Sequence, residues 1–520
     1  MKGIESERSD DLIRLERYAE SEYADDVERN GLDETWRRMM EMVGNSNDPK
    51  GLVQSFDFGE LYETGLVLVD AEAKKNSGKY FTPKDVAVVM ADWLKGLKGS
   101  NVCDVCCGTG NLILTYLERI GNEEATNLLE SGRVFLYDVD PTATFICRSL
   151  IGILYGEKAK RAVNANVGDF LDDSVVLPFD CKAISNPPYA KIRNLKETYP
   201  TNEVAARTGE LYAAFLSKIL TSSDASVVVA PQSFLGGRKF DLLRKEMNER
   251  NGFVVAFDNV PGSLFVGSGT GSKNKSVRSA IVVTENEPNS NGYRCSGLIR
   301  FGTSERGKVV DADFLKRALG RVRRTTENGE RFAKVFPEFE ETFERWTRTD
   351  GRLEDLMTKD SEHALWIPTT CRYYFVATRN EPKRDGKRKI CFKDERAEIL
   401  AYGAMNSSLC YWFWRVCDGG FTFPLSLLVE TPFSESLVPK EDEKRFESLV
   451  REMMENERKF LSYKKNAGRV QETTKFPKRY RDELNEILLK GIGSNLPASA
   501  FDAIHANSIS SFESAFERNE

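Results

Sequence analysis

Histidine is almost missing from this sequence: only His363 and His505 occur among 520 residues, far apart and without metal-ligand spacing around either one. Histidine-dependent hydrolases and multi-histidine metal sites are therefore nearly excluded. The sequence also lacks a run of the roughly 20 apolar residues that a membrane-spanning helix requires. No apolar segment of the kind found in secretory signals follows Met1. These absences predict a cytoplasmic protein that does not contact a membrane.

Cysteine is present but forms no recognisable site. The segment Cys103-Asp104-Val105-Cys106 has the CxxC form, yet a zinc site normally needs a second such pair and the chain has none. Several of the ten cysteines stand inside apolar runs, which favours reduced side chains packed in the interior of a cytosolic protein. We therefore expect no metal. Because the net charge is −6, a nucleic-acid partner would have to meet a local basic patch.

The chain is long enough for two or more domains, and its pattern changes along its length. Residues 1–60 are charge-rich with helical spacing and predict a helical lead-in. From 61 to 290, short apolar runs alternate with amphipathic stretches, which is typical of a parallel α/β sheet. The predicted strands are 101–105, 134–137, 183–185, 226–230, 254–257 and 280–283. The predicted helices include 85–94, 112–120, 142–155, 210–220 and 240–248.

A linker is predicted after this region, where the segment 286–297 is polar and rich in residues that break helices and strands. Residues 291–520 have an irregular, mixed pattern with basic and aromatic clusters, and they predict a separate α+β domain.

The first chemical signal is a glycine-rich segment between a predicted strand and a predicted helix, Asp104-Val105-Cys106-Cys107-Gly108-Thr109-Gly110-Asn111-Leu112. Glycines there let the backbone approach a ligand closely, at the carboxyl end of a strand, where open α/β sheets bind ligands. Ile113 stands where the dinucleotide-binding fingerprint has its third glycine, so that fingerprint is incomplete. A plain strand-to-helix turn is the alternative interpretation.

Two acidic positions follow the glycine-rich segment. Asp138 ends the next predicted strand and can accept hydrogen bonds from both hydroxyls of a ribose, because an ionised carboxylate is only an acceptor. Asp140 is better suited to cap the helix that begins after Pro141, and capping by both acids is the alternative. In Gly168-Asp169-Phe170 a carboxylate beside a ring could bind the amine of an adenine, although the segment alone is equally consistent with a turn.

The motif with the clearest chemistry is Asn186-Pro187-Pro188-Tyr189, directly after the apolar run 183–185. Two consecutive prolines lack amide donors, so they cannot continue a central strand or a helix and instead stiffen a loop. The carboxamide oxygen of Asn186 and the carbonyl of Pro187 are then two fixed acceptors, which match the two hydrogens of an exocyclic amine. Tyr189 offers a flat face on which the base that carries this amine can stack.

In this order, with Gly78-Lys79-Tyr80-Phe81-Thr82-Pro83 before the glycine-rich segment, the motifs resemble the S-adenosylmethionine-dependent adenine-N6 DNA methyltransferases, in the γ arrangement of restriction–modification systems. The resemblance covers roughly residues 60–285; Val105 and Cys106 depart from the proline and small residue usual in that family. It implies a Rossmann-like methyltransferase domain with a mixed, mostly parallel sheet, residues 61–290. A carboxy-terminal α+β DNA-recognition domain, residues 291–520, would follow.

The resemblance also assigns roles to the matching residues. Those that would bind S-adenosylmethionine are Phe81, Thr82, Asp104, Cys107, Gly108, Gly110, Asp138, Asp169 and Phe170. Asn186, Pro187, Pro188 and Tyr189 would form the catalytic loop, which holds the target amine for direct methyl transfer.

A base inside a duplex must be extruded to reach such a loop. Phe265 would then stack on the base opposite Tyr189, and a packing role alone is the alternative for this ring.

The C-terminal region contains two basic runs, residues 379–393 and 464–481. Lys383, Arg384, Lys387 and Arg388 in the first run are predicted to contact DNA phosphates. A solvated loop is the alternative for both runs. The aromatic run Tyr411-Trp412-Phe413-Trp414 is predicted to lie in a hydrophobic core.

The predicted function is site-specific methylation of adenine N6 in double-stranded DNA, in restriction–modification or phage defence. We expect a monomer, with a restriction or specificity subunit as a candidate further partner. One alternative is another acceptor amine: cytosine N4, an RNA base or a protein glutamine. The other is a non-catalytic DNA-binding subunit with a methyltransferase fold.

Overall fold

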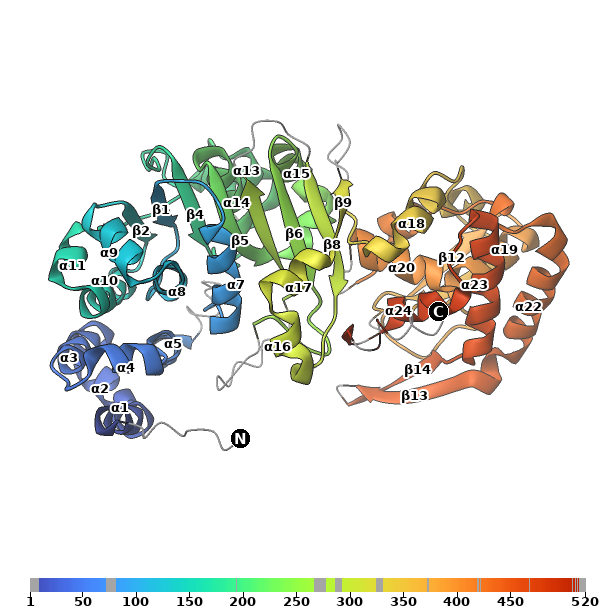
Figure 1. The fold of residues 1–520 in the computed structure, drawn as a ribbon. Helices are drawn as coiled ribbons and strands as arrows, with labels where there is room; N and C mark the ends of the chain where they lie inside the picture. Colours follow the sequence, from blue (N-terminus) through green and yellow to red (C-terminus); the bar gives the residue numbers. More distant parts are fainter. Residues whose placement is uncertain are drawn as a thin grey trace, which may run out of the picture.

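The computed structural model describes residues 9–71, 81–192, 194–265, 277–285, 292–323, 331–371, 374–418, 420, 422–466, 468–506, 508–509, 511 and 513. The chain has three parts: in Figure 1 the N-terminal helices lie below the left part of a sheet domain, and a C-terminal domain lies to the right of it. Within these described ranges, no helix is long and apolar enough to cross a membrane.

The predicted helical lead-in is present as five helices that build a small core of their own. Trp36, Tyr23 and Tyr62 are buried in this core, which also takes in one side of the later helix α10. The last of the five helices runs past the expected boundary at residue 60. The five are α1 (Asp10–Ser21), α2 (Tyr23–Asn30), α3 (Leu32–Gly44), α4 (Pro49–Ser55) and α5 (Phe58–Val69).

The sheet domain is built on nine strands in the order β3-β2-β1-β4-β5-β7-β6-β8-β9. β3, β2, β1, β4 and β5 run parallel, and β7 runs antiparallel between β5 and β6. This order and direction confirm the predicted Rossmann-like, mixed and mostly parallel fold. The strands are β1 (Asn101–Asp104), β2 (Val134–Asp138), β3 (Asn164–Val167), β4 (Cys181–Ser185), β5 (Ala225–Pro231), β6 (Asn251–Phe257), β7 (Ser279–Glu285), β8 (Tyr293–Ile299) and β9 (Leu319–Arg323).

Helices cover both faces of this sheet, which is why its central strands are apolar on both sides. In β5, Val227 and Val229 belong to one buried cluster, and Val228 and Ala230 belong to the other. The first cluster includes α7 (Lys84–Lys95), α8 (Asn111–Ile120), α9 (Asn122–Glu130) and part of α10 (Pro141–Tyr155). The second includes α13 (Glu203–Thr208), α14 (Leu211–Ser222) and α15 (Asp241–Asn248). The remaining helices of this domain are α11 (Glu157–Ala162), α12 (Leu195–Thr198), α16 (Arg306–Val309) and α17 (Ala312–Arg317).

All six predicted strands and all five predicted helices of this domain are confirmed within a few residues. Three strands were not predicted: β3, whose four residues include two asparagines, β8 and β9. The predicted linker 286–297 is wrong from residue 293 onward, because β8 begins there and buries Tyr293 and Cys295. Arg294, Ser296 and Gly297 interrupt the apolar pattern that would have revealed this strand. The sheet continues to Arg323, so we propose a domain boundary after β9 in place of residue 291.

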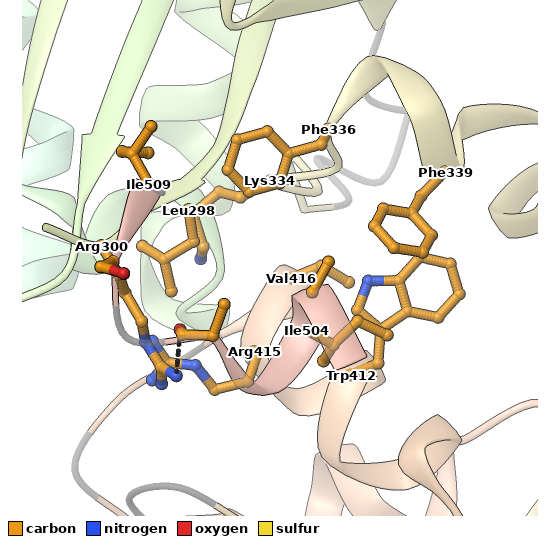
Figure 2. Close-up of a pocket in the computed structure, with 13 residues that line it drawn as sticks. Leu298, Arg300, Lys334, Phe336, Phe339, Trp412, Arg415, Val416, Ile504 and Ile509 are labelled. Atoms are coloured by element: carbon orange, nitrogen blue, oxygen red, sulfur yellow. Dashed lines mark hydrogen bonds between the residues drawn. The ribbon is translucent and has the colours of Figure 1, made fainter. Parts of the chain in front are cut away.

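The sheet domain and the C-terminal domain meet at a buried cluster of charges. Asp258, just after β6, accepts hydrogen bonds from Arg278 (2.8 Å), Arg300 (2.7 Å) and Arg415, and Arg415 belongs to the C-terminal helix α20 (Ser408–Cys417). Burial alone would raise the pKa of Asp258, but the three guanidinium groups hold this pKa well below its usual range. Figure 2 shows Arg300 and Arg415 converging from the two domains beside a small cavity with a largely apolar wall.

The C-terminal domain combines a three-stranded sheet, a two-stranded hairpin and helices, which confirms the predicted α+β composition. Part of the basic run 379–393 forms β12, the central strand of the three-stranded sheet, and is not the solvated loop of the alternative interpretation. The strands are β10 (Met357–Thr358), β11 (Ala364–Pro368), β12 (Lys387–Phe392), β13 (Leu461–Asn466) and β14 (Arg469–Thr474). The helices besides α20 are α18 (Glu340–Thr347), α19 (Glu395–Asn406), α21 (Leu425–Val429), α22 (Glu443–Asn456), α23 (Lys478–Ile492) and α24 (Asp502–His505).

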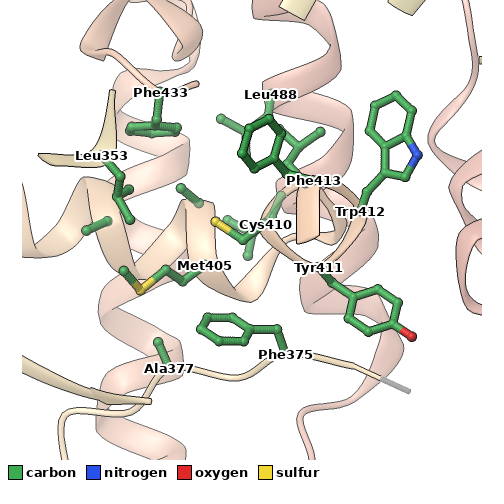
Figure 3. Packing of buried hydrophobic residues seen from close by; sticks show 14 of the residues in the cluster. Leu353, Phe375, Ala377, Met405, Cys410, Tyr411, Trp412, Phe413, Phe433 and Leu488 are labelled. Atoms are coloured by element: carbon green, nitrogen blue, oxygen red, sulfur yellow. The ribbon is translucent and has the colours of Figure 1, made fainter. Parts of the chain in front are cut away.

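The core of the C-terminal domain forms around α19 and α20. The four residues of the aromatic run 411–414 on α20 are all buried, which confirms the prediction that they belong to a core. Figure 3 shows Phe413 and Cys410 pointing into the packed interior, with Phe433 and Leu488 nearby. Trp412 stacks on Trp346 with ring centroids 5.5 Å apart. Burial of this many large side chains lets the domain hold its own shape.

The Asp258 cluster predicts a large loss of stability when its single carboxylate is neutralised. Asp258→Asn leaves three arginines close together with only a neutral acceptor, and removal of one partner from a buried ion cluster typically costs about 3–5 kcal/mol. We expect a decrease of this size in the free energy of unfolding, measured by urea denaturation. Asp92→Asn is the matched control, because the Asp92–Arg119 pair is largely exposed and such pairs contribute at most about 1 kcal/mol. Equal losses in the two variants would contradict the role given to Asp258.

Candidate active site

A cavity lies where the carboxyl ends of β1, β2 and β4 meet. It encloses about 970 Å³ outside the protein atoms, part of it open to solvent, which is in the size range of small-molecule sites. Nine of the predicted cofactor and catalytic positions line it: Phe81, Thr82, Cys107, Gly108, Asp138, Asp169, Phe170, Asn186 and Pro188. Asp104, Gly110, Pro187 and Tyr189 are not part of its lining. Most of the positions that the motifs singled out therefore share one cavity.

The glycine-rich turn forms the floor of the cavity next to β1. Gly108 and Gly110 have left-handed φ angles of 51° and 99°, which few other residues adopt. A Cβ at Gly110 would also lie 2.7 Å from the Sγ of Cys147, so this position has no room for a side chain. The N–H of Gly108 donates to Oδ2 of Asp138 over 2.9 Å. The turn thus presents backbone to the cavity and positions an acidic side chain at the same time.

Asp138 and Asp140 have different tasks, as predicted. Asp140 caps α10, accepting from the N–H groups of Thr142 and Ala143, and it also accepts from the hydroxyl of Tyr62. The prediction that Asp140 is a helix cap is confirmed. Asp138 does not cap that helix; its two oxygens accept from the N–H groups of Gly108 and Asp140. These bonds fix the Asp138 carboxylate at the cavity wall, in a position to accept further hydrogen bonds.

Asp104 lies behind the glycine-rich turn and is fully buried. Its Oδ1 accepts from the N–H of Cys106 over 3.3 Å, and its Oδ2 has no hydrogen-bond partner in the part of the chain that the structure describes. Burial raises the pKa of Asp104 to about 8, and the charge of Asp138 contributes in the same direction. Near neutral pH this carboxyl group therefore holds a proton for much of the time.

The carboxamide of Asn186 is held in place by Thr82. Its Nδ2 donates to the Oγ1 of Thr82 over 3.1 Å, and the backbone carbonyl of Thr82 accepts from the side chain of Asn111. The nitrogen end of the amide is thus engaged with Thr82, and the oxygen end, Oδ1, is a buried acceptor in this structure. Thr82 and Asn186 were predicted to serve the cofactor and the target amine, and the structure joins them directly.

Tyr189 and Phe265 lie together, as the base-stacking prediction requires. Their ring centroids are 5.9 Å apart, but the rings are nearly perpendicular, at 88°. The hydroxyl of Tyr189 donates to the carbonyl of Val229 over 3.4 Å. A base between the two rings would need them parallel and farther apart. Stacking by this pair therefore stays a prediction, and it requires a change in the Phe265 ring.

The motif analysis missed several residues that line the cavity, among them Tyr62, Leu66 and Tyr199. Tyr199 donates its hydroxyl to Asp169, and burial together with this bond raises the pKa of Tyr199. Because its other oxygen accepts from the N–H of Leu171 over 2.9 Å, Asp169 has both carboxylate oxygens engaged before any ligand is considered. Tyr62 and Leu66 come from α5 of the N-terminal helices. Nothing in the sequence around Tyr199 could have identified it, because its contact with Asp169 joins two segments that are 30 residues apart.

The four cations predicted to contact DNA are in the C-terminal domain, and most of them are engaged locally. Lys387 forms an ion pair with Glu381 over 2.7 Å and lies over the ring of Trp366. Arg384 and Arg388 are half-buried, and only Lys383 of the four is exposed. Their role in DNA binding stays a prediction.

Comparison with known proteins gives a consistent picture. Residues 54–291 match the family model described as N-6 DNA Methylase. The chain is 27% identical over 242 residues to the type II methyltransferase M.VspI of Vibrio sp. (strain 343), covering 45% of this chain and 53% of that protein. It is 25% identical over 232 residues to the type I restriction enzyme MpnII methylase subunit of Mycoplasma pneumoniae, covering 40% and 41%. The matched region therefore spans about half or less of these relatives.

Among solved structures, the DrdV–DNA complex aligns with 61% of this chain and 39% of its own chain, at a TM-score of 0.42 and 14% identity. The M protein of the type I restriction enzyme EcoKI aligns with 86% of this chain and 88% of its own, at a TM-score of 0.34 and 14% identity.

The buried Asp104 predicts a stability that depends on pH in a defined direction. Its pKa is about 8 in the folded chain and about 3.9 when unfolded, so the folded state binds more protons between these values. This contribution to stability is complete below pH 4 and is lost as the pH rises through 8. Asp104→Asn removes the dependence. From pH 5 to pH 8, the free energy of unfolding of this variant should rise relative to the unaltered chain by up to about 3 kcal/mol. A difference that stays constant across this range, by urea denaturation without cofactor, would contradict the assignment.

Proposed function

We propose that the chain, whose residues 54–291 match the N-6 DNA methylase family model, methylates the N6 amine of adenine at specific sites in double-stranded DNA, with S-adenosylmethionine as methyl donor. The observation that carries the proposal is the Asn186 carboxamide, held by Thr82 at the edge of a cavity made of the glycine-rich turn and Asp138. Two fixed acceptors beside a cofactor-sized cavity match the needs of amine methylation.

The residues of the cavity fit S-adenosylmethionine. The Asp138 carboxylate, fixed by backbone amides, suits the two hydroxyls of a ribose. Phe170, Leu211 and Phe215 form an apolar part of the wall that suits the faces of an adenine ring. The backbone of the glycine-rich turn can approach the ligand closely. The buried Asp104 behind the turn would have its carboxylate form favoured by a cationic group of the cofactor.

The catalytic loop would act on the target amine by orienting it. Asn186 and the carbonyl of Pro187 would each accept a hydrogen bond from one N–H of this amine. This arrangement favours a pyramidal nitrogen whose lone pair points toward the cofactor side of the cavity. When bound, S-adenosylmethionine supplies an electrophilic methyl group on a sulfonium. Pro187 and Pro188 keep the acceptors rigid, so little reorganisation accompanies the transfer. The loop residues form no covalent bond to the base in this scheme.

Double-stranded DNA is the proposed partner, and the C-terminal domain would read its sequence. One base would be extruded from the duplex toward Tyr189 and Phe265. We propose that the chain acts as a cytoplasmic monomer in restriction–modification. Type I methylase subunits among its relatives make a specificity or restriction subunit the additional partner to test.

The acceptor can be identified directly. The purified chain is incubated with isotope-labelled S-adenosylmethionine and either genomic DNA, RNA or protein, and the modified nucleosides or residues are identified by mass spectrometry. Label in N6-methyladenine of DNA supports the proposal. Label in N4-methylcytosine, in RNA or in a protein glutamine identifies another acceptor, and no label with normal cofactor binding identifies a non-catalytic subunit.

Asn186→Ala should separate binding from catalysis. The side chain is assigned to the target amine, so the affinity for S-adenosylmethionine, measured by calorimetry, should change little. The activation free energy of methyl transfer should rise by several kcal/mol, which lowers kcat/KM more than a hundredfold. Activity within about tenfold of the unaltered enzyme, roughly 1.4 kcal/mol, would contradict the assigned role.

Asp138→Ala should have the opposite signature. Loss of a charge-assisted acceptor for the ribose should weaken S-adenosylmethionine binding by about 2 kcal/mol or more, which is at least roughly thirtyfold in Kd. Asp140→Asn, which alters the neighbouring helix cap, is the comparison. If both substitutions change Kd equally, the ribose role of Asp138 is not supported.

A further inference from the structure

The second basic run of the sequence forms a projecting hairpin in the C-terminal domain. β13 and β14 pair antiparallel in a register that joins Leu461 to Thr474 and Asn466 to Arg469. Near its base the hairpin is anchored, because Glu472 and Thr474 are buried. Toward the turn, residues 463–465 and 468–470 are all exposed. In Figure 1 the hairpin runs along the lower edge of the C-terminal domain, with its turn on the side of the sheet domain.

The register divides the exposed part of the hairpin into two faces. Cross-strand partners share a face and successive residues alternate, and Lys465 pairs with Val470 while Tyr463 pairs with Glu472. One face therefore carries Tyr463, Lys465 and Val470; the other carries Lys464 and Arg469. Tyr463 and Val470 are 62% and 64% exposed. Two large apolar side chains and a lysine thus stand together on one exposed face.

The cations near the turn are more available than those at the start of α23, which end the same basic run. Among the described residues, Lys464 and Lys465 form no ion pair, and Arg469 pairs only with Asp385, where both side chains are more than 70% exposed. By contrast Lys478, Arg479 and Arg481 on α23 are paired with acidic side chains of the same domain. An exposed pair such as Arg469–Asp385 is weak and can be exchanged for another anion.

The hairpin also joins the first basic run. The N–H of Glu472 donates to the carbonyl of Lys383 over 2.9 Å, and the N–H of Lys383 donates to the Glu472 side chain over 3.4 Å. Lys383, the one exposed cation of the four in that run, therefore lies against the hairpin. Residues about 80 positions apart in the sequence form one positively charged surface.

We propose that the β13–β14 hairpin enters the major groove of the DNA duplex and is the element by which the C-terminal domain reads sequence. This inference rests on the proposed function. A major groove about 12 Å wide admits a two-stranded β-ribbon. The face with Tyr463, Lys465 and Val470 faces the base edges, where Val470 suits the methyl group of thymine and Lys465 suits acceptors of guanine. Lys464 and Arg469, with Lys383 beside the hairpin, contact phosphates.

The test compares two lysine pairs of the full-length chain. Lys464→Ala with Lys465→Ala removes the two unpaired cations of the hairpin. Lys440→Ala with Lys444→Ala is the matched control. These exposed lysines lie at the start of α22, and the hairpin follows the other end of that helix, about 20 Å away. Binding of a fluorescent duplex is measured by anisotropy from 50 to 200 mM salt, with S-adenosylmethionine affinity as a check on folding.

The hairpin variant should bind the duplex at least about tenfold more weakly at 100 mM salt, and the slope of log affinity against log salt should decrease by about two. The control should match the unaltered chain in both quantities. A hairpin variant that matches the control overturns the proposal, and it leaves the proposed function standing if the unaltered chain methylates DNA. A chain that neither binds nor methylates DNA overturns both.

Base reading has its own measurement. Val470→Ser keeps the charge of the hairpin, so affinity for DNA of unrelated sequence should remain within about twofold. The set of sites that the variant methylates in genomic DNA, read by modification-sensitive sequencing, should broaden at one or more positions of the recognised sequence. An unchanged site set in Val470→Ser and in Tyr463→Ser would overturn the assignment of this face to base edges.

Discussion

The hydrogen bond from the Asn186 carboxamide to the Thr82 hydroxyl is the interaction on which the site depends. Thr82 stands just before α7, and Asn186 follows β4, so the bond ties two segments that are about 100 residues apart in the sequence. It fixes the orientation of the amide, whose Oδ1 is buried in this structure. Asn111 opens α8 after the glycine-rich turn, and its side-chain amide donates to the backbone carbonyl of the same threonine. Thr82 thus joins the start of α8, beside the glycine-rich turn, to the segment after β4.

Two buried acids of this chain show how surroundings decide charge. Asp104 is fully buried near the charge of Asp138, and its pKa is raised to about 8. Asp258 is equally enclosed but is bonded to three arginines, and its pKa is lowered. Asp258 also begins the segment that leads to Phe265, and Arg306 donates to the carbonyls of Ser263 and Leu264 in that segment. The segment that carries the predicted base-stacking ring is thus attached to both domains.

The sequence predicted well those parts of the fold and site whose residues are constrained locally. Strands buried on both faces have continuous apolar runs, so β1, β4 and β5 could be found, and the paired prolines after β4 marked the end of that strand. β8 could not, because its apolar residues are interrupted by Arg294 and Gly297 while tertiary packing still buries it. The Tyr199–Asp169 contact and the Glu472–Lys383 contact depend on distant segments meeting, and no local pattern encodes them. Perpendicular packing of Tyr189 on Phe265 likewise follows from the folded arrangement alone.

The central claim is that the chain presents two rigid oxygen acceptors to an extruded adenine. The most direct measurement is a crystal structure of the chain with a non-reactive analogue of S-adenosylmethionine and a duplex that contains its recognised site. The account predicts the adenine N6 within hydrogen-bonding distance of both the Asn186 Oδ1 and the Pro187 carbonyl, with Asp138 on the ribose of the analogue. An adenine that is bound elsewhere, with the Asn186 amide oxygen turned into the protein interior, would contradict it.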